Sequence, residues 1–437
     1  MTEIPEHLRK RAEEARQKAA AAKAEEAAPA AEAAAPSEGG QEDSVLFEVR
    51  GHLGLITLNR PKAVNALTHE MVNLMWAQLV RWADDAAISA VAIRGAGERG
   101  LCAGGDVVAI YQDITRPDRT PETPFDTMGF WRDEYRLNLL ISRYPKPYVA
   151  LMDGLVLGGG IGVSAHGSHR VVTERTRSGL PETQIGFSPD VGGTYLLGHA
   201  PGGTGAHAAL TGAHLDAGDA LYLGLADVFV ESNRLDSLLT ALETESATEV
   251  LTRFAGLAPG SSLEAARGWI DPAYTHGDAR AVLAALDAGG GDSAAAADVI
   301  RKKSPTAVAV ALSAVRAGGE HDLRSALQNE WRAGYRFLTG HDFAEGIRAQ
   351  VIDKDRNPAW EPASLSAVDP RIGDHYLAPL PHLPLDLSPV DAVLRPAVVH
   401  EDAPEPGDLQ YGQGSPELVY PASDTPDSPD APFTSTS

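Results

Sequence analysis

The amino-acid sequence predicts an α/β fold that is followed by a largely helical C-terminal region. Between residues 45 and 173, short apolar segments typical of strands alternate with longer segments whose apolar residues recur at helical spacing. From about Leu235 onward, the apolar residues recur almost only at helical spacing. Alternating strands and helices are typical of sheets whose neighbouring strands are joined by helical crossovers.

Composition places the chain among acidic globular proteins. Its 437 residues are 43% hydrophobic and 22% charged, so most of the chain can bury a core. The net charge of −23 argues against nucleic acid or an anionic membrane as the main partner. The single cysteine excludes intramolecular disulfides and cysteine-rich metal sites. No stretch reads as a transmembrane helix, and the charged N-terminus lacks the apolar core of a secretory signal, so we expect a cytoplasmic protein.

The two ends of the chain differ in composition from its middle. Residues 1–43 are rich in Ala and Glu, whereas residues 398–437 are acidic, rich in Pro and free of Lys and Arg. Together they carry −12 of the net charge. Neither end has an apolar stripe, so burial cannot offset the entropy lost on ordering them. We therefore expect both ends to be disordered.

The first predicted elements are a β-hairpin, a helix and a strand. Residues 45–50 and 55–58 read as two strands joined by a glycine-containing turn. Thr68 is placed to cap the helix that follows. The apolar stripe of that helix consists of Met71, Met75, Leu79 and Trp82. Residues 90–94 then form a short apolar strand.

Further along, helices are predicted over residues 107–114 and 128–143, and strands over 147–152 and 171–173. The clearest helix of the C-terminal region spans 321–340. Its apolar stripe consists of Leu323, Leu327, Trp331, Tyr335 and Leu338.

Two glycine-rich segments fall at junctions between predicted strands and helices. They are Leu101-Cys102-Ala103-Gly104-Gly105-Asp106 and Gly158-Gly159-Gly160-Ile161-Gly162. A helix N-terminus without side chains leaves its N–H groups free, so two such ends aimed at one point would form an oxyanion hole for an acyl carbonyl. The alternative is that the glycines only permit tight turns, and either segment taken alone favours that alternative. Neither segment matches a phosphate-binding fingerprint.

A third segment, residues 180–193, holds two carboxylates in an apolar, turn-rich stretch. These are Glu182 and Asp190. Paired acids in one low-dielectric site split their pKa values, so one can act as a base while the other donates a proton. The alternative is a surface loop with two solvated acids, which the pattern by itself favours.

Other candidates carry weaker signals. Cys102 fits a small buried residue better than a nucleophile, because no partner for it is evident. His166 and His169 lack a third ligand for a metal ion and are interpreted as structural. Glu134 lies on a predicted helix, and its spacing alone indicates a solvated face.

Taken together, these segments resemble the crotonase (enoyl-CoA hydratase/isomerase) superfamily. The shared motifs are residues 58–67 (LNRPKAVNAL), residues 102–106 and the glycine triplet at 158–160. Further segments are most similar to the 3-hydroxyisobutyryl-CoA hydrolase branch. They are residues 132–135, 146–151, 181–186, 189–193, 340–348 and 352–355. The resemblance covers residues 44–375, and the order and combination of the motifs are more specific than any one of them.

The resemblance implies a fold and a division of the chain. The family fold is a spiral of ββα units with a helical C-terminal region. We therefore expect a tail over 1–43, a crotonase-like core over 44–240 and a helical region over 241–375. Residues 376–437 would form an extended segment that continues into the acidic tail. The superfamily commonly forms trimers or pairs of trimers, so a homo-oligomer is expected to be accessible.

The resemblance also assigns an oxyanion hole. The family's two donors fall on the N–H groups of Gly105 and Gly159, which would hold the thioester oxygen as negative charge develops on it. Gly104 beside them would contact the substrate.

The acids that the resemblance assigns distinguish the branches. Glu182 would be the active-site acid, and the hydrolase branch adds Asp190 as a second acid and Glu134 as a substrate-contacting carboxylate. Enoyl-CoA hydratases carry another glutamate at the position of Gly162, which cannot supply a proton. We therefore expect hydrolysis of a short branched 3-hydroxyacyl-CoA thioester, as in valine degradation, with Glu182 as nucleophile or as base for water. The alternatives are an enoyl-CoA hydratase or isomerase and, from another class, a non-catalytic acyl-CoA-binding protein.

An acyl-CoA substrate sets requirements of its own. The resemblance implies no metal or redox cofactor, because CoA arrives as part of the substrate. Arg60 and Lys62 are expected to contact the CoA phosphates. Since the net charge opposes a substrate with several phosphate charges, a local basic patch must offset it.

Overall fold

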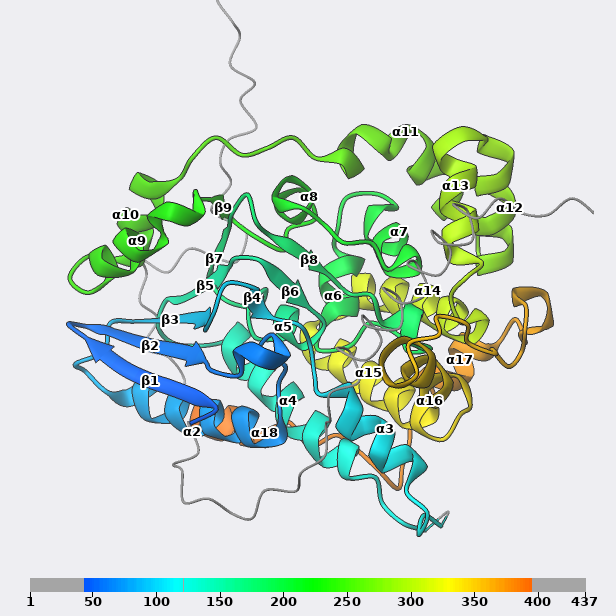
Figure 1. Ribbon diagram of the computed structural model, residues 1–437, viewed down its shortest axis with the longest axis horizontal. Coiled ribbons are helices and arrows are strands. Elements are labelled where there is room, and N and C mark those ends of the chain that lie inside the picture. The colour runs from blue at the N-terminus through cyan, green and yellow to red at the C-terminus, as the bar shows by residue number, and fades with distance from the viewer. Residues whose placement is uncertain (1–42, 121, 395–437) are drawn as a thin grey trace, which may run out of the picture. The chain divides into compact units, whose positions relative to one another are not determined.

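The strands form two sheets in which nearly all neighbours are parallel (Figure 1). The structure is a computed structural model that describes residues 43–120 and 122–394. The larger sheet has the order β1 (Val45–Arg50), β2 (Leu53–Leu58), β3 (Ala90–Gly95), β5 (Tyr148–Met152), β7 (His169–Val172) and β9 (Val228–Phe229). The smaller sheet has the order β4 (Gly100–Cys102), β6 (Leu155–Leu157) and β8 (Arg177–Gly179). The antiparallel pair is β1 with β2.

The helices lie mainly after the strands in the chain. The first are α2 (His69–Asp84), α3 (Val107–Thr115), α4 (Asp126–Ser142), α5 (Gly159–Gly162), α6 (Gly193–Gly198), α7 (Thr204–Thr211) and α8 (Ala217–Tyr222). Next come α9 (Leu235–Leu242), α10 (Ala247–Phe254), α11 (Ser262–Tyr274), α12 (Ala279–Gly289), α13 (Gly291–Ile300), α14 (Pro305–Glu320), α15 (Leu323–Leu338), α16 (Asp342–Ile347), α17 (Ile372–Leu377) and α18 (Ser388–Val393). Short turns are η1 (Pro61–Ala63), η2 (Glu182–Ile185), η3 (Ser232–Arg234), η4 (Arg348–Ile352) and η5 (Leu365–Ala367). None of the helices in the described ranges has the length and apolarity needed to span a bilayer.

Three strands of the larger sheet, β3, β5 and β7, are each followed in the chain by a strand of the smaller sheet. β3 is followed by β4, β5 by β6 and β7 by β8, and a helical turn follows each pair. These helical segments are the helices α3 and α5 and the short 3-10 helix η2. This repeat is the predicted spiral of ββα units, so the predicted fold class is confirmed.

The larger sheet is covered on both faces, which explains the nearly continuous apolar runs of its strands. In β2, Leu53 and Leu55 pack in a cluster that includes residues of α9 and α10. Ile56 and Leu58 pack in the other cluster, with residues of α2 and α4. Because side chains alternate across a strand, one strand supplies both layers of the core.

Several predicted elements are confirmed by the structure. β1 and β2 pair antiparallel around a turn at Gly51, whose φ of +57° favours glycine. The Thr68 side chain accepts a hydrogen bond of 3.2 Å from the Met71 N–H at the start of α2. α15 occupies most of the predicted 321–340 helix, and the region after residue 235 is almost entirely helical.

The smaller sheet was not predicted. Its strands have three residues each, too few for an alternating pattern to be recognised. As a result, the second glycine-rich segment follows β6 and not, as expected, the strand at 147–152. α6, α7 and α8 were also missed, because they have six to eight residues and weak stripes.

The C-terminal helices pack against helices that belong to the α/β part of the chain. α14 and α15 pack against α6, α15 also packs against α4, and α16 packs against α3 and η2 (Figure 1). Residues 44–394 belong to one compact unit, and the predicted boundary at residue 240 stays a prediction. The predicted disordered ends, 1–43 and 398–437, lie outside the described residues apart from residue 43. Residues 376–394 were predicted as an extended segment, and they include the helix α18. In this last stretch Asp391 pairs with Arg143 at 2.8 Å and with Arg324 at 2.6 Å, which ties α18 to α4 and α15.

Candidate active site

Three segments meet where the strands of the smaller sheet end. Because β4, β6 and β8 are parallel, their carboxyl ends lie at the same edge of the sheet. β4 leads to Gly104, β6 to Gly158 and β8 to Glu182. Ligands of α/β proteins commonly bind outside this edge. A pocket of about 250 Å³ lies there and is lined by all three residues.

Two backbone N–H groups face this pocket without acceptors. Within residues 43–120 and 122–394, no hydrogen bond uses the N–H of Gly105 or of Gly159. The two groups are close together, since a Cβ built on Gly159 would lie 3.3 Å from the Gly105 nitrogen. Gly104 has a φ of +106°, which a residue with a side chain rarely adopts. Two free N–H groups this close together can act as an oxyanion hole, and this role for the glycine-rich segments stays a prediction.

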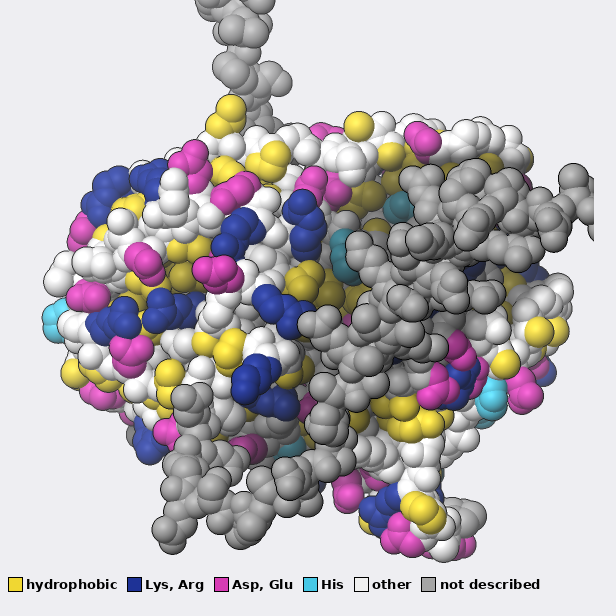
Figure 2. All heavy atoms as spheres, in the orientation of Figure 1, with side chains coloured by type: hydrophobic (Ala, Val, Ile, Leu, Met, Phe, Trp, Pro, Cys, Tyr) yellow, Lys and Arg dark blue, Asp and Glu magenta, His cyan; other side chains and the backbone are white. Residues whose placement is uncertain are grey.

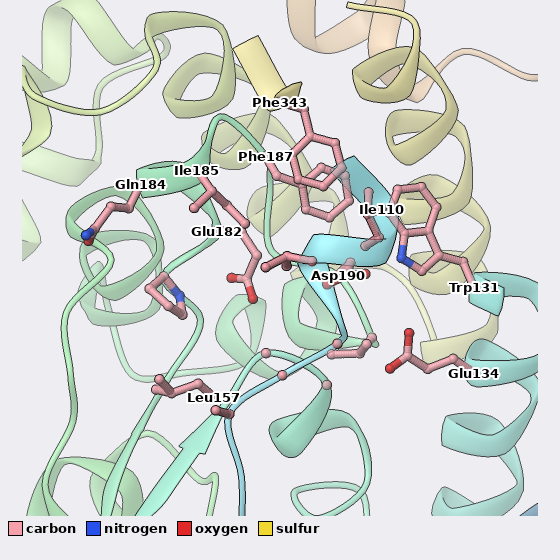
Figure 3. Close-up of a pocket in the computed structure, with 18 of the residues that line it drawn as sticks. Ile110, Trp131, Glu134, Leu157, Glu182, Gln184, Ile185, Phe187, Asp190 and Phe343 are labelled. Atoms are coloured by element: carbon pink, nitrogen blue, oxygen red, sulfur yellow. The ribbon is translucent and has the colours of Figure 1, made fainter. Parts of the chain in front are cut away.

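Three carboxylates converge on the same pocket from different elements (Figure 3). Glu134 comes from α4, Glu182 from η2 and Asp190 from the loop before α6. They are 2%, 7% and 7% exposed, so none is the solvated acid that its local pattern allowed. A Cβ on Gly158 would lie 3.0 Å from Glu182 Oε1, and a Cβ on Gly159 would lie 2.8 Å from Glu134 Oε1. Glycines at these positions therefore let the acids approach the amide pair.

The carboxylates are held in an apolar, mutually repelling environment. Burial, and then the negative charge of Asp190, raise the pKa of Glu134 and of Glu182 well above the ordinary glutamate value. Burial raises the pKa of Asp190 to about 7, although a hydrogen bond from Tyr135 lowers it. Oε1 of Glu134 and Oε2 of Glu182 are buried and have no hydrogen-bond partner within the described residues. These acids can therefore exchange protons with a bound substrate near neutral pH.

Asp190 is positioned by residues that the sequence did not reveal. The Tyr135 hydroxyl donates a hydrogen bond of 3.0 Å to Asp190 Oδ2. Glu330 of α15, 2% exposed, accepts hydrogen bonds from the N–H groups of Gly192 at 2.7 Å and Thr194 at 3.0 Å. It also accepts one from the Thr194 hydroxyl. Glu330 thus fixes the loop that carries Asp190, and no local motif marks a residue that acts across 138 positions.

We expect Glu330 to make stability fall as pH rises. Burial raises its pKa from the ordinary 4.5 to about 8, so its contribution is fully present below about pH 4.5 and is lost as pH rises through about 8. The melting temperature of the wild type should therefore fall by several degrees between about pH 5 and about pH 9. Glu330→Gln should melt lower than wild type at pH 5, because it loses acceptor capacity, yet show a smaller fall. The exposed Glu264→Gln variant serves as control, and an unchanged fall in Glu330→Gln would contradict the prediction.

One wall of the pocket is apolar and largely aromatic. Trp131, Phe187 and Phe343 form a stack in which Trp131 and Phe187 have centroids 5.2 Å apart and Phe187 and Phe343 4.5 Å apart. Ile110 completes this wall in Figure 3. The pocket therefore offers a small apolar space beside a carboxylate and two free amides, which fits a short acyl group.

Arg60 and Lys62 do not line the pocket. The Arg60 guanidinium donates to the Ala66 carbonyl at 2.5 Å and pairs with Asp106 at 3.2 Å, so it braces the loop before α2. Lys62 lies in η1 and is exposed. Their predicted contacts with CoA phosphates stay predictions.

The weaker candidates occupy structural positions. Cys102 is buried, and burial raises the pKa of its thiol to about 12, which leaves little thiolate. His166 Nε2 lies 2.8 Å from the Val191 carbonyl oxygen, and His169 Nε2 lies 3.1 Å from the Thr248 hydroxyl. In the described part of the chain, no group of three or more His, Cys, Asp and Glu residues is arranged to hold a metal ion.

Gly162 leaves no room for a larger residue. A Cβ built on it would lie 2.7 Å from the Cβ of Val191 and 2.8 Å from Nδ2 of Asn138. Both contacts are closer than packed atoms approach, so a glutamate at this position would displace α4 or the loop at 191. Gly162 itself has no side chain that could donate a proton, and Val191 and Asn138 occupy the space that a larger side chain would need.

Comparisons with known proteins agree with this geometry. The family model described as enoyl-CoA hydratase/isomerase matches residues 53–377. The chain is 38% identical to the mitochondrial 3-hydroxyisobutyryl-CoA hydrolase of Danio rerio, over 80% of this chain and 93% of the relative. It is 35% identical to the human protein of that name, over 76% of this chain and 88% of the relative.

Two solved structures carry different titles. One, titled a carnitinyl-CoA dehydratase from Mycobacterium thermoresistibile, is 45% identical with a TM-score of 0.75, over 79% of this chain and 99% of that one. The other, titled an enoyl-CoA hydratase from Rhodobacter sphaeroides, is 39% identical with a TM-score of 0.73, over 79% and 100%.

Proposed function

Because the chain belongs to the enoyl-CoA hydratase/isomerase family, we propose that it hydrolyses 3-hydroxyisobutyryl-CoA to 3-hydroxyisobutyrate and CoA, a step of valine degradation. The observation that carries this proposal is the similarity to curated 3-hydroxyisobutyryl-CoA hydrolases over about four fifths of the chain. The pocket agrees, because it joins a free amide pair to buried acids and a small apolar wall.

The reaction follows from the placement of these groups. The thioester oxygen accepts hydrogen bonds from the N–H groups of Gly105 and Gly159, which stabilise the negative charge that develops on it. Glu182 then acts in one of two ways. Its carboxylate adds to the carbonyl carbon and expels the CoA thiolate, and water hydrolyses the resulting anhydride. Alternatively, it takes a proton from water as the water oxygen adds to that carbon.

The other two carboxylates have separate roles: Asp190 acts on the CoA thiolate that leaves, and Glu134 binds the 3-hydroxyl of the substrate. Asp190, with its pKa of about 7, can deliver a proton to the departing thiolate and recover one from water. In Figure 3 Glu134 lies on the same side of the pocket as Trp131 of the apolar wall, where the acyl group would extend. Its unpartnered Oε1 is placed to accept a hydrogen bond from the 3-hydroxyl.

Hydration of an enoyl-CoA is the competing reaction, because solved relatives carry the titles of a dehydratase and a hydratase. Two glutamates that share one water would require an acid near position 162. Val191 and Asn138 fill that space here. Hydrolysis needs one acid at position 182 and is therefore favoured.

The CoA portion would lie over a basic part of the surface. Figure 2 shows Lys and Arg side chains along the middle of one face, in the area of β6 and β8. Arg177 opens β8 and is exposed, and Arg99 donates a hydrogen bond of 3.4 Å to the Lys62 carbonyl. A basic area on this face would offset the acidic net charge for a phosphate-bearing substrate.

Three parts of the proposal rest on sequence alone. No cofactor beyond the CoA of the substrate is required. A cytoplasmic location is retained as a prediction, although the curated relatives are named as mitochondrial. A homo-oligomer is retained as well.

The proposal is tested by thiol release. We expect the wild type to release CoA thiol from 3-hydroxyisobutyryl-CoA, measured with a thiol reagent, without hydrating an enoyl-CoA such as crotonyl-CoA, measured by loss of the enoyl absorbance. Rapid loss of the enoyl absorbance without thiol release would favour the hydratase alternative. Tight binding of both esters without turnover would favour the non-catalytic binding protein.

A further inference from the structure

Lys303 is a buried lysine without a counter-ion. It lies just before α14 and is 8% exposed. Its Nζ donates a hydrogen bond of 3.2 Å to Oε1 of Gln184, which is a neutral amide. Across the described ranges, Lys303 takes part in no ion pair.

The surroundings of Lys303 add positive charge. Burial, and then the neighbouring Lys302, lower the pKa of Lys303. Lys303 stands one position before Ser304, the N-cap of α14, so the positive end of the dipole of this helix follows it in the chain. A buried charge without a partner is costly, and an anion at this point would relieve both the desolvation and the repulsion.

A cavity of about 500 Å³ opens beside Lys303, between α12, the start of α14 and residues 363–366. Arg280, Arg301 and the carboxylate of Asp287 also line it. Arg301 already pairs with Asp287 and Asp298, and Arg280 has Nε 3.8 Å from Asp278. Ser364 and Ser366, both exposed, contribute two hydroxyl groups to the rim. Among the Lys and Arg side chains that line this cavity in the described ranges, Lys303 is thus the one without a carboxylate partner.

Gln184 connects Lys303 to the active site. It lies in η2, two positions after Glu182, and it lines the catalytic pocket. In Figure 3 its side chain points away from Glu182 and Asp190, on the side opposite Trp131 and Glu134. Because Lys303 contacts Gln184, it lies near the end of the pocket that is opposite the aromatic wall. With the acyl group against that wall, the CoA portion of a substrate would extend from this end.

We propose that Lys303 and the adjoining cavity form a phosphate-binding subsite. The inference rests on the proposed function for the source of the phosphate, which we take to be the CoA portion of the substrate. A free phosphate compound would satisfy the same chemistry and is separated from it by the experiment below. Binding is ionic, with the Lys303 ammonium group donating to phosphate oxygens.

The test compares two thioesters of the same acid. One is 3-hydroxyisobutyryl-CoA, and the other is the N-acetylcysteamine thioester, which retains the thioester but lacks every phosphate. We expect Lys303→Gln to raise KM for the CoA ester about tenfold and to leave kcat/KM for the truncated ester unchanged. Lys302→Gln, which removes an exposed lysine one position away, is the matched control, and Lys303→Arg should restore most of the affinity.

A second measurement separates ligand binding from a structural role. Removing an uncompensated buried charge should leave the melting temperature of the free protein unchanged or raise it, whereas a structural lysine would lower it. Adenosine 3′,5′-bisphosphate, used as the phosphate-bearing ligand, should raise the melting temperature of the wild type and of Lys302→Gln but not of Lys303→Gln.

The outcomes are distinct. A selective loss on the CoA ester supports the subsite with CoA as its source. Unchanged kinetics, together with loss of the stabilisation by adenosine 3′,5′-bisphosphate in Lys303→Gln, support a site for a free phosphate compound and contradict CoA as its source. Equal losses on both esters, or no difference from Lys302→Gln in any measurement, overturn the proposal. Failure of the wild type to hydrolyse either ester would instead contradict the proposed function, and the melting measurements would still test the site.

Discussion

Replacing Glu182 with Gln should lower kcat for 3-hydroxyisobutyryl-CoA hydrolysis by at least about a thousandfold. Both routes to the product pass through the Glu182 carboxylate, as nucleophile or as base, and the amide can serve as neither. The oxyanion donors are backbone groups and remain in place, so the variant should retain binding of the CoA ester. Thiol release measures the loss, and calorimetric titration with the substrate measures the retained affinity.

Loss of folding would imitate this result, so the variant needs two controls. Glu264→Gln makes the same change at an exposed position of α11 and should be as active as wild type. Because Glu182 is buried with its pKa raised, Glu182→Gln should melt at or above the wild-type temperature near pH 8. A Glu182→Gln protein that is folded and as fast as wild type would refute the assigned role.

Replacing Asp190 with Asn should lower kcat by about a hundredfold and shift the pH profile. The negative charge of Asp190 raises the pKa of Glu182 and of Glu134. Its removal should therefore lower the pKa of Glu182, and the acidic limb of kcat, which rises as Glu182 ionises, should move to lower pH. The asparagine can still accept the hydrogen bond from Tyr135, so the loop should keep its position.

The pH profile separates a chemical role from a structural one. A variant that is merely misplaced would lose rate at every pH without a shift of the limb. Asp292→Asn, at an exposed position of α13, is the control for the same substitution and should reproduce the wild-type profile. An Asp190→Asn profile that is lower but not displaced would contradict proton coupling between the two acids.

The elements with long or regular patterns were predictable from the sequence. The stripe of α2 and its Thr68 cap are local signals, and they survive because the helix packs one face on the sheet. The strands of the smaller sheet were missed because three residues carry no periodicity. Tertiary pairing, and not local propensity, makes these segments strands.

The site was predictable in part, and the part that failed shows why. Glu182 and Asp190 stand in one segment, so a pair of acids could be proposed from sequence, although the local pattern favoured a solvated loop. Spacing alone placed Glu134 on a solvated face and was wrong, because α4 is buried on more than one side. Only the resemblance to a family indicated Glu134. Glu330 and Lys303 were absent from the prediction, since each acts on a segment more than 100 positions away.

The hydrogen bonds that Glu330 accepts from Gly192 and Thr194 also have a consequence for folding kinetics. They join positions 138 and 136 residues apart, so the loop that carries Asp190 is fixed by contacts of very high contact order. Such contacts form after local ones, because the chain must first lose the entropy of closing the long loop between them. Intermediates with most of their helices and both sheets should therefore still lack an ordered catalytic loop. Recovery of activity should lag behind recovery of helical circular dichroism during refolding.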